Sequence, residues 1–446
     1  MPKPKSIKVI ELFAGVGGFR IGFEGYKGMS AISGYTKPLK NKIPFEVVYS
    51  NQYEPATPTK QYANDIYKLR FGDKGHIEKD INDVTADDLK TKCDLMVGGF
   101  PCQNYSVASL LRDAKGLIGE KGILWWQIER LINELDKKNK APDYLLLENV
   151  DKLLISPTPR PGEKKSNGKD FAIILSSLSR HGYNVEWRMI NAGDYGFPQR
   201  RRRVFIFAYR KGSIVHKKLK NFTHENIIFE SGIIAKTFPC ELKHKLKQTE
   251  LFTREISDDR EKYMKNYTDG RFKHAGVMID GQVIEHDVRV NKNYKADKAL
   301  KSCIGQILQP LKDVDNEFLI KNKDKVKEWK NQKLSHGEDR TAKDGTKYTW
   351  KVGTMDFPDS LNKPSRTILT SEGTKSPSRT SHIICQNKTF RRLTPIELER
   401  LNMFPDNFTD IEAIPLSKRG FMMGNALVIG IVEKLGISLA NYLVSK

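Results

Sequence analysis

The chain has 446 residues, enough for two domains of which one is enlarged. It carries 76 Lys and Arg against 54 Asp and Glu, and the net charge of +22 favours a polyanionic partner, nucleic acid before an anionic membrane surface. A hydrophobic content of 38% excludes a wholly disordered chain, and no apolar run approaches the roughly 18 residues of a membrane span.

The five cysteines are scattered along the chain, at positions 93, 102, 240, 303 and 385. None belongs to a CxxC pair and no histidine cluster has ligand spacing, so the sequence predicts neither a disulfide framework nor a metal site. The first residues lack the apolar segment of a signal peptide. We therefore expect a cytoplasmic protein with reduced thiols.

Short apolar runs and amphipathic segments alternate from residue 7 to residue 210. The runs predict strands at 7–13, 45–51, 93–100, 143–150, 183–192 and 202–210. The third and fourth runs are almost continuously apolar, which is typical of parallel strands buried on both faces. Apolar residues at helical spacing predict helices at 124–138 and 171–182. This alternation predicts a doubly wound, Rossmann-like α/β domain.

A glycine-rich turn follows the first strand, in the segment ELFAGVGGFRIG (11–22). Glycines let a ligand approach the backbone, and the helix that follows presents unpaired N–H groups. The segment matches neither the GxGxxG pattern nor the phosphate-binding loop. On its own it leaves ligand binding and a purely structural turn equally open.

Cys102 lies just past a buried strand, in the segment GGFPCQ. In an open α/β sheet, ligands bind at the carboxyl ends of the strands. A thiolate in that position is a nucleophile, and nearby positive charge lowers the pKa of a cysteine. The alternative is a buried, inert cysteine, which is the usual state of a free thiol. The strand-end position and the flanking proline favour the nucleophile.

Two further groups of polar residues flank apolar strands. Glu148 and Asn149 end the run DYLLLENV, where a carboxyl group can exchange a proton with a substrate; a capping role is the alternative. Four arginines, 200–203, open the run RRVFIF. Because side chains alternate along a strand, Arg201 and Arg203 should share one face, and one such pair could line a site. A surface basic patch is the alternative for these arginines.

From about residue 211 to residue 390 the pattern becomes irregular and polar. This stretch has 35 Lys and Arg against 24 Asp and Glu, so it holds about half of the net charge. Within it, KNKDKVKEWKNQK (321–333) is best explained as a solvated helix face. The segments TPIELERLNMFPDNF and GFMMGNALVIGIVEKLGISLANYL are again helical and apolar. We expect the last helix to pack on the first domain, so that the middle region is an insertion.

A nucleophilic cysteine, a strand-end acid, an arginine pair and a basic chain suit chemistry on a pyrimidine. A thiolate can add to carbon 6 of the ring if an acid engages the ring nitrogen and donors hold its carbonyl oxygen. Carbon 5 then becomes nucleophilic enough to accept a methyl group.

Six segments, in this order, resemble the motifs of the DNA (cytosine-5)-methyltransferases of the bacterial and phage restriction–modification type. They are ELFAGVGGFRIG, GFPCQ, ENV, QRRRR, RRLTPIELERLNMFPDNF and RGFMMGNALVIGIVEKL. The resemblance implies a catalytic domain at 1–212 and 389–446 that binds S-adenosyl-L-methionine, with a target-recognition domain at 213–388. It also implies a monomer that acts on double-stranded DNA, and a cognate restriction endonuclease is a candidate partner.

The resemblance also implies roles for individual residues. The catalytic residues would be Cys102 as nucleophile, Glu148 as the partner of the ring nitrogen and amino group, and Arg201 and Arg203 as the orienting pair. Residues 103–122 would close over an extruded base. The donor would be bound by Phe13, Gly15, Gly17, Gly18, Tyr53, Asp80, Ile81, Pro101 and Asn425. DNA would be contacted by Gln103, Ser106, Asn149 and Thr367.

Two positions depart from the family pattern. Glu11 stands where members more often have Asp, and Gln52 stands where most have a Glu that binds the ribose hydroxyls. Glu54, expected on the same strand face as Gln52, is a candidate substitute.

Three other functions compete with this interpretation. An RNA cytosine methyltransferase is the nearest, but the main RNA family resembled has a cysteine in the motif that here reads LLENV, and the DNA-like member that acts on tRNA lacks a large insertion. Adenine methyltransferases need an (N/D)PP(Y/F) motif, which is absent. A catalytically dead DNA-binding regulator would have no reason to keep all four catalytic residues.

Overall fold

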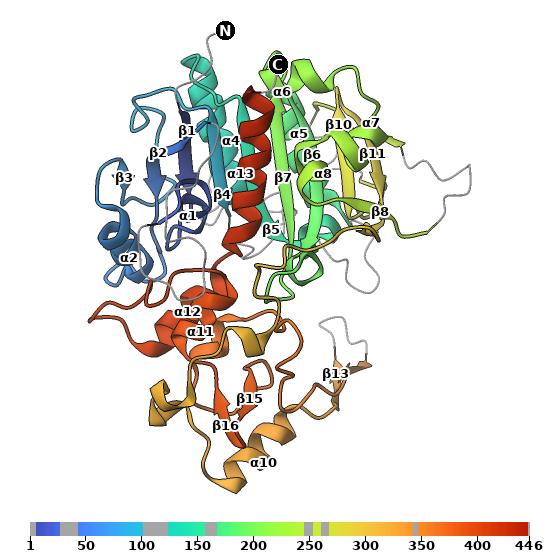
Figure 1. Cartoon of the computed structure of the whole chain (residues 1–446). Helices are drawn as coiled ribbons and strands as arrows, with labels where there is room; N and C mark the ends of the chain where they lie inside the picture. The colour runs from blue at the N-terminus through green and yellow to red at the C-terminus, as the bar shows by residue number, and fades with distance from the viewer. Residues whose placement is uncertain are drawn as a thin grey trace.

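The computed structural model describes residues 6–26, 43–100, 124–156, 167–244, 253–259, 267–341 and 347–444. Figure 1 shows an upper body built on a large sheet and a lower, more irregular body. We call them the sheet domain (residues 6–291 and 429–444) and the small domain (residues 302–425). The large sheet contains ten strands in the order β3-β2-β1-β4-β5-β7-β6-β10-β11-β9.

Half of the large sheet is parallel and half is antiparallel. The parallel strands are β1 (Ile7–Leu12), β2 (Phe45–Asn51), β3 (His76–Ile77), β4 (Leu95–Gly99) and β5 (Tyr144–Val150). The antiparallel strands are β6 (Tyr183–Asn191), β7 (Arg202–Arg210), β9 (Thr253–Glu255), β10 (Ala275–Ile279) and β11 (Gln282–His286). The six strands expected from the sequence are therefore all present, and the doubly wound α/β fold is confirmed.

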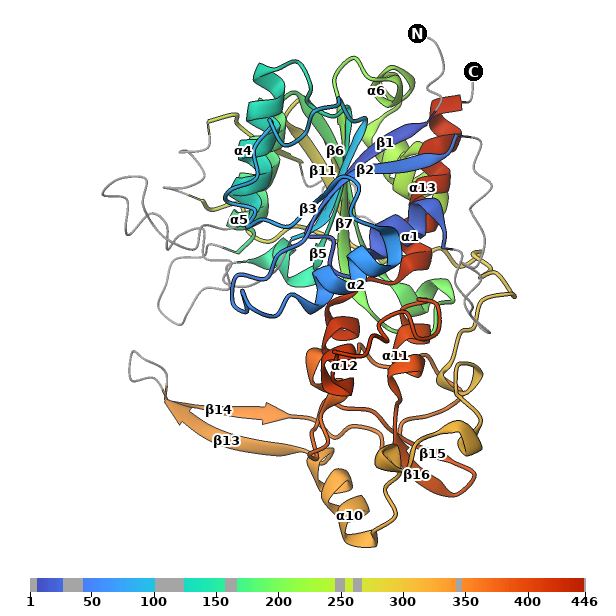
Figure 2. The same ribbon diagram turned by 90° about the vertical axis from the view of Figure 1, so that its left-hand side faces the viewer.

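Helices cover both faces of this sheet, as Figure 2 shows edge-on. One face carries α4 (Leu124–Lys137) and α5 (Lys169–Arg180), and the other carries α1 (Gly18–Glu24) and α13 (Ile429–Val444). The strands between them are buried on both faces: in β5, Leu146 belongs to the core beside α13 and Leu147 to the core beneath α4. This burial explains the nearly continuous apolar runs.

The remaining elements are shorter. In the sheet domain they are α2 (Tyr62–Phe71), α6 (Ile214–Leu219), α7 (His224–Asn226), α8 (Ile233–Thr237), β8 (Cys240–Leu242) and β12 (Val288–Val290). The small domain contains α10 (Lys323–Gln332), β13 (His336–Thr341), β14 (Lys347–Val352), β15 (Ile383–Gln386), β16 (Thr389–Arg392), α11 (Pro395–Leu401) and α12 (Leu416–Asn425).

The small domain combines apolar contacts with a buried ion pair. Among the described residues, its separate apolar cluster contains three buried side chains, Ile320, Trp329 of α10 and Ile383, and most of its other buried apolar residues belong to the main core. Arg391 and Glu397, both 0% exposed, form a two-pronged ion pair with N–O distances of 2.6 and 2.8 Å. Such pairs specify one arrangement of chain segments because an unpaired partner would be costly.

Neither expected domain boundary coincides with a division of this structure. After residue 213, strands β9, β10 and β11 extend the large sheet next to β6, instead of starting a separate body. The boundary at 388/389 falls in the turn between β15 and β16, which pair with each other. The final apolar segment forms two helices, α12 and α13, and α13 packs on the sheet domain beside α1.

One helical stretch, Leu416–Val444, is long and apolar enough by length and composition to cross a membrane. In this structure 72% of its most apolar window is buried, chiefly because α13 packs between α1 and α8. The apolar composition is therefore explained by burial in the protein core.

Candidate active site

The order of the strands brings several of the expected site residues to one edge of the sheet. Strands β2, β1, β4 and β5 are parallel neighbours, so their carboxyl ends lie side by side. Phe13 follows β1, Tyr53 follows β2, Phe100 follows β4, and Glu148 lies near the end of β5. Ligands of open α/β sheets bind at this edge.

Glu148 forms an ion pair with Arg203 at this edge. The distance from Arg203 Nε to Glu148 Oε1 is 2.7 Å, and the two side chains are 17% and 13% exposed respectively. The pair forms because β5 and β7 are antiparallel neighbours in which Val150 lies opposite Arg203. A Cβ atom on Gly99, in the adjacent strand, would lie 3.2 Å from Glu148 Oε2, so glycine there leaves room beside the carboxylate.

Arg201 also turns inward but does not contact Glu148. Its side chain is 1% exposed and donates to the backbone oxygens of Ile368 (3.2 Å) and Gly424 (2.9 Å). Burial lowers the pKa of Arg201, and the positive charge of Arg203 acts in the same direction. The expected alternation is present, because Arg200 and Arg202 are exposed. However, only Arg203 pairs with the acid, and Arg201 joins the sheet domain to the small domain.

Asn149 contacts the backbone beside the cysteine motif. Its Nδ2 donates to the oxygen of Phe100 at 3.0 Å, and its Oδ1 accepts from Val150 N at 2.8 Å. Phe100 is the last described residue before the cysteine segment, so Asn149 fixes the point at which that segment leaves β4. Four expected site residues lie outside the described residues: Pro101, Cys102, Gln103 and Ser106.

Most of the residues expected to bind the methyl donor lie around the ends of β1, β2 and β3. Phe13, Gly15 and Gly17 have positive φ angles (53°, 54° and 88°), which makes the turn after β1 tight; Gly18 begins α1. A Cβ atom on Gly15 would meet no atom within 4 Å, so the space over this glycine is open to a ligand. Tyr53 is half-buried at the end of the adjacent strand.

The other residues expected to bind the methyl donor differ in how far they are buried. Ile81 is 5% exposed in the core beneath α4, whereas Asp80 is partly exposed and accepts from Asn82 N at 2.9 Å. Asn425 is the exposed last residue of α12. An open glycine turn flanked by an aromatic, an aliphatic and polar groups fits S-adenosyl-L-methionine, which has an adenine ring, a ribose and a charged methionine end.

Gln52 contacts the glycine turn directly. Its Oε1 accepts from Gly15 N at 2.7 Å, and the residue is 7% exposed. The expectation that Glu54 shares a strand face with Gln52 is wrong, because β2 ends at Asn51 and both residues follow it. The Glu54 carboxylate accepts from Thr57 Oγ1 at 3.4 Å, within its own turn.

Glu11 is completely buried beneath the same turn. It accepts from Arg20 N at 3.3 Å and from Tyr67 Oη at 2.9 Å. Burial raises the pKa of Glu11 to about 7, against the lowering effects of Tyr67 and Arg20. Glu11 therefore ties the end of β1 to α1 and α2 as a supporting residue of the turn.

Thr367 lies where the small domain meets the start of β7. Its hydroxyl donates to the backbone oxygen of Arg200 at 2.7 Å. Sequence reasoning missed the neighbouring Gln199, which is 0% exposed and bonds to Asn402 Oδ1 (2.8 Å) and to Ile368 N (3.0 Å). Nothing local in the sequence marks this contact, because Asn402 is some two hundred positions away.

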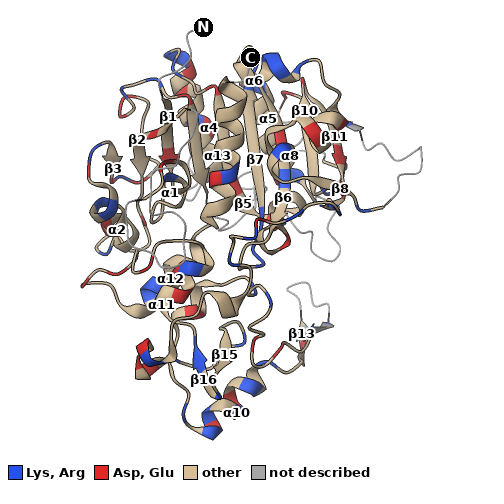
Figure 3. Ribbon diagram, viewed as in Figure 1, with Lys and Arg blue, Asp and Glu red and all other residues tan. Residues whose placement is uncertain are grey.

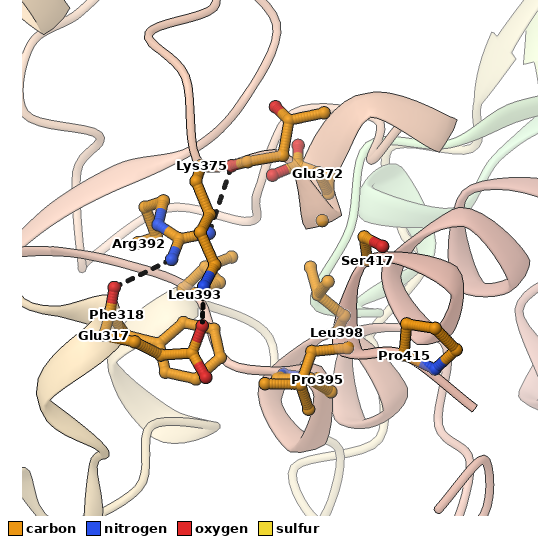
Figure 4. Close-up of a pocket in the computed structure, with 13 residues that line it drawn as sticks. Glu317, Phe318, Glu372, Lys375, Arg392, Leu393, Pro395, Leu398, Pro415 and Ser417 are labelled. Carbon is orange, nitrogen blue, oxygen red and sulfur yellow. Dashed lines mark hydrogen bonds and ion pairs between the residues drawn. The ribbon is translucent and has the colours of Figure 1, made fainter. Parts of the chain in front are cut away.

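Two cavities lie in or beside the small domain. One of about 510 Å³, shown in Figure 4, is lined by Glu317, Lys375, Arg392 and the first residues of α12. Its charged groups are already paired with protein atoms, such as Lys375 with Glu317 at 3.0 Å. The second, about 260 Å³, lies between Arg200 and residues 354–366, close to the strand that carries Arg203.

Lys and Arg residues occur on both bodies, as Figure 3 shows, and are not confined to one basic tail. This distribution agrees with the near-equal division of the net charge between the two parts of the sequence. Among the described residues there is no group of three or more His, Cys, Asp or Glu side chains that could hold a metal ion.

Comparison with known proteins gives one consistent result. A model of the C-5 cytosine-specific DNA methylases matches residues 7–441. The type II methyltransferase M.Sau3AI of Staphylococcus aureus is 41% identical over 434 residues, which cover 96% of this chain and 94% of that protein. M.HaeII of Haemophilus aegyptius is 32% identical over 205 residues, which cover 46% of this chain and 51% of that protein.

Solved structures agree at the level of the fold. The Entamoeba histolytica methyltransferase EhMeth has a TM-score of 0.54 at 16% identity, with 99% of this chain and 98% of that chain covered. The Dnmt2 methyltransferase of S. pombe has a TM-score of 0.54 at 15% identity, with 98% of each chain covered. Because this similarity extends along almost its whole length, the chain belongs to the C-5 cytosine-specific DNA methylase family and is a DNA cytosine-5 methyltransferase.

Proposed function

We propose that the enzyme methylates carbon 5 of a cytosine extruded from duplex DNA, with S-adenosyl-L-methionine as donor and a covalent adduct on Cys102. The observation that carries this proposal is the ion pair between Glu148 and Arg203 at the end of β5. That pair lies beside β4, and Cys102 follows β4 in the sequence, which supports a role for the acid and the cation near the nucleophile.

Each residue has a defined part in the reaction. Glu148 first takes up a proton from solvent. The Cys102 thiolate adds to carbon 6 of the cytosine, and Glu148 donates that proton to the ring nitrogen as the electrons of the ring move away from carbon 6. Arg203 holds the Glu148 carboxyl group, and its N–H groups that do not contact Glu148 can donate to the carbonyl oxygen of the ring. Carbon 5 becomes nucleophilic as a result.

When bound, the donor would supply an electrophilic methyl group; the methyl–sulfur bond breaks as carbon 5 forms the new bond, and S-adenosyl-L-homocysteine leaves. A base in solution then removes the proton from carbon 5, the bond between carbon 6 and sulfur breaks, and the thiolate of Cys102 is released. The ring nitrogen returns its proton to Glu148, which releases it to solvent, so the enzyme ends in its starting state. The cytosine must leave the stack because carbon 6 is inaccessible within a duplex.

The recognition and biological setting are extensions of the same proposal. The inserted part of the chain, which here is the small domain, selects the DNA sequence. Because M.Sau3AI bears the name of a type II methyltransferase, we place this enzyme in a restriction–modification system, where a cognate endonuclease would cut the unmethylated site. We expect the enzyme to act as a monomer.

Covalent trapping tests the mechanism. A duplex with 5-fluorocytosine at the target should bind the wild type irreversibly, because carbon 5 then has no proton to lose. Cys102→Ser should abolish both trapping and methyl transfer, while binding of the donor and of duplex DNA stays near the wild-type level. Trapping that persists in Cys102→Ser would refute the assignment.

A second assay distinguishes DNA from RNA as the substrate. Plasmid DNA and tRNA are each incubated with the enzyme under identical conditions, and methylated cytosines are then located by bisulfite sequencing. We expect transfer to the duplex alone. Transfer to tRNA without transfer to DNA would overturn the proposal for the substrate and leave the proposal for the nucleophile intact.

A further inference from the structure

The small domain carries a hairpin whose two strands pair only with each other among the described strands. Strands β13 and β14 form a separate two-stranded sheet with six residue pairs, from His336↔Val352 to Thr341↔Lys347. Figure 2 shows it extending from the small domain as an arm, on the side of the molecule where α4 and α5 cover the large sheet. An isolated two-stranded hairpin is at best marginally stable in water, so the arm requires additional contacts to stay folded.

The base of the arm is fixed by Arg379. Its guanidinium donates to the oxygen of Leu334 at 2.7 Å, just before β13, and to the oxygen of Gly353, just after β14. Lys333, only 1% exposed, donates to the oxygen of Arg379 at 2.7 Å, and Met355 N donates to the oxygen of Lys333 at 2.8 Å. The two ends of the hairpin, before β13 and after β14, are therefore held together.

One face of the arm consists of exposed residues, most of them polar. Three cross-strand pairs share this face, and all six residues are exposed: Gly337 with Lys351, Asp339 with Thr349, and Thr341 with Lys347. Thr349 Oγ1 donates to Asp339 Oδ1 at 2.7 Å. Neither lysine has an ion-pair partner among the described residues. The face thus presents a cation at each end and a hydrogen-bonding pair in the middle.

The arm is connected to the catalytic strand. The chain leaves β14 at Val352 and reaches Ser365, whose backbone forms a parallel bridge with Gln199. Arg200 N donates to the oxygen of Ser365 at 2.8 Å, and Ser365 N donates to the oxygen of Pro198 at 2.8 Å. This segment therefore fixes the arm relative to the start of β7, which carries the partner of Glu148.

We propose that the β13–β14 arm enters the major groove of DNA beside the extruded cytosine and reads base edges there with Asp339 and Thr349. This inference rests on the proposed function. The major groove, ~12 Å wide, admits a two-stranded β-ribbon, and the three pairs span about 14 Å, or about four base-pair steps. A carboxylate accepts from the amino group of cytosine, a hydroxyl both donates and accepts, and lysines contact guanine edges or phosphates.

The first test replaces the acceptor at the centre of the arm. The wild-type methylation pattern is read by bisulfite sequencing of DNA from expressing cells, and the measurement is repeated for Asp339→Ala. We expect the preference at one base pair of the site to relax by about fivefold or more. Asp313→Ala, an exposed acid in the same domain but off the arm, should keep the wild-type pattern.

The second test measures how the two lysines contribute to DNA affinity. Replacing Lys347 and Lys351 together by alanine should weaken binding of a target duplex. If both contact phosphate, the slope of log affinity against log salt should fall by about 2; if both contact guanine, sequence preference should relax at two base positions. The matched control removes Lys325 and Lys327, which are exposed on α10, and should change neither quantity.

The outcomes distinguish the two levels of the proposal. A wild-type enzyme that methylates no DNA would refute the proposed function itself. Normal methylation by the wild type, with pattern and salt slope unchanged in both arm variants, would overturn the role of the arm alone. An even loss of methylation in Asp339→Ala, without a change of sequence preference, would also overturn base reading by this residue.

Discussion

At the scale of single residues, Gln52 offers the sharpest test of donor binding. Its Oε1 accepts from Gly15 N, whereas its amide nitrogen has no partner among the described residues. Gln52→Glu would keep that acceptor and add a charged oxygen. Hydrogen bonds to charged groups contribute ~1.5–3 kcal/mol against ~0.5–1.5 for neutral ones. We expect donor binding to tighten up to about tenfold in calorimetric titration, with little change of rate at saturating donor.

Glu54→Gln is the matched variant for this test. Because Glu54 bonds within its own turn to Thr57, its neutralisation should leave donor affinity near the wild-type value. The reverse pattern, weaker binding in both variants, would mean that Glu54 and not Gln52 serves the ribose.

Glu11 makes stability depend on pH. Its folded pKa is about 7, above the ordinary value of 4.5, because burial disfavours the carboxylate. The folded state therefore holds a proton that the unfolded state loses, and stability falls as pH rises from about 4.5 to about 7. Between pH 5 and pH 8 this group should cost about 2–3 kcal/mol of unfolding free energy.

Urea unfolding of the wild type and of Glu11→Gln at pH 5 and pH 8 measures this effect. The variant should lose less stability over that interval, since a Gln side chain cannot deprotonate. Equal pH dependence in the two proteins would show that Glu11 is already ionised at pH 5 in the folded state.

At the scale of secondary-structure elements, Arg379 should act as a positioning residue for the arm. Arg379→Ala removes the bridge between the two ends of the hairpin, so backbone amides of β13 and β14 should exchange with solvent about tenfold faster or more. Sequence preference should relax as well, and Arg379→Lys should restore it only partly, because an ammonium group lacks the planar fork of a guanidinium. Unchanged exchange would show that the hairpin is held by other contacts.

The same scale shows what the sequence could and could not predict. Strands β4 and β5 and helices α4 and α5 were predictable because burial on both faces and helical periodicity are local signals. Strands β9 to β11 were not, since they are three to five residues long and join the sheet only through pairing with β6. The arm was not predicted either, because its strands are polar on an exposed face.

At the scale of the whole molecule, Arg201 and Arg203 should behave differently when replaced. Arg201→Ala leaves the oxygens of Ile368 and Gly424 without their donor, and the loss of stability should be on the order of 2–4 kcal/mol. Arg203→Ala breaks the pair with Glu148 at the site and should lower the methyl-transfer rate about 100-fold, with a small effect on stability.

Thermal unfolding together with single-turnover kinetics separates the two effects. If Arg201→Ala instead kept full stability and lost only rate, Arg201 would belong with the catalytic residues as the sequence suggested. Sequence reasoning placed both arginines on one face correctly, because alternation along a strand is local. It could not distinguish their roles, because the partners of Arg201 are contributed by the small domain.

The position of α13 has a consequence for how the enzyme is made. The strands of the large sheet through β11 end at His286, whereas α13, which covers one face of that sheet beside α1, begins at Ile429. At ~5–20 residues per second, roughly 7–30 s of translation separate these two points. During that interval the surface that α13 will cover is exposed on the nascent chain, and the sheet domain cannot finish folding. Ribosome-bound chains arrested before Ile429 should therefore be cut by protease within the sheet domain, while released chains resist it. Because the small domain precedes α13 in the sequence, the sheet domain is completed only after the small domain has been synthesised.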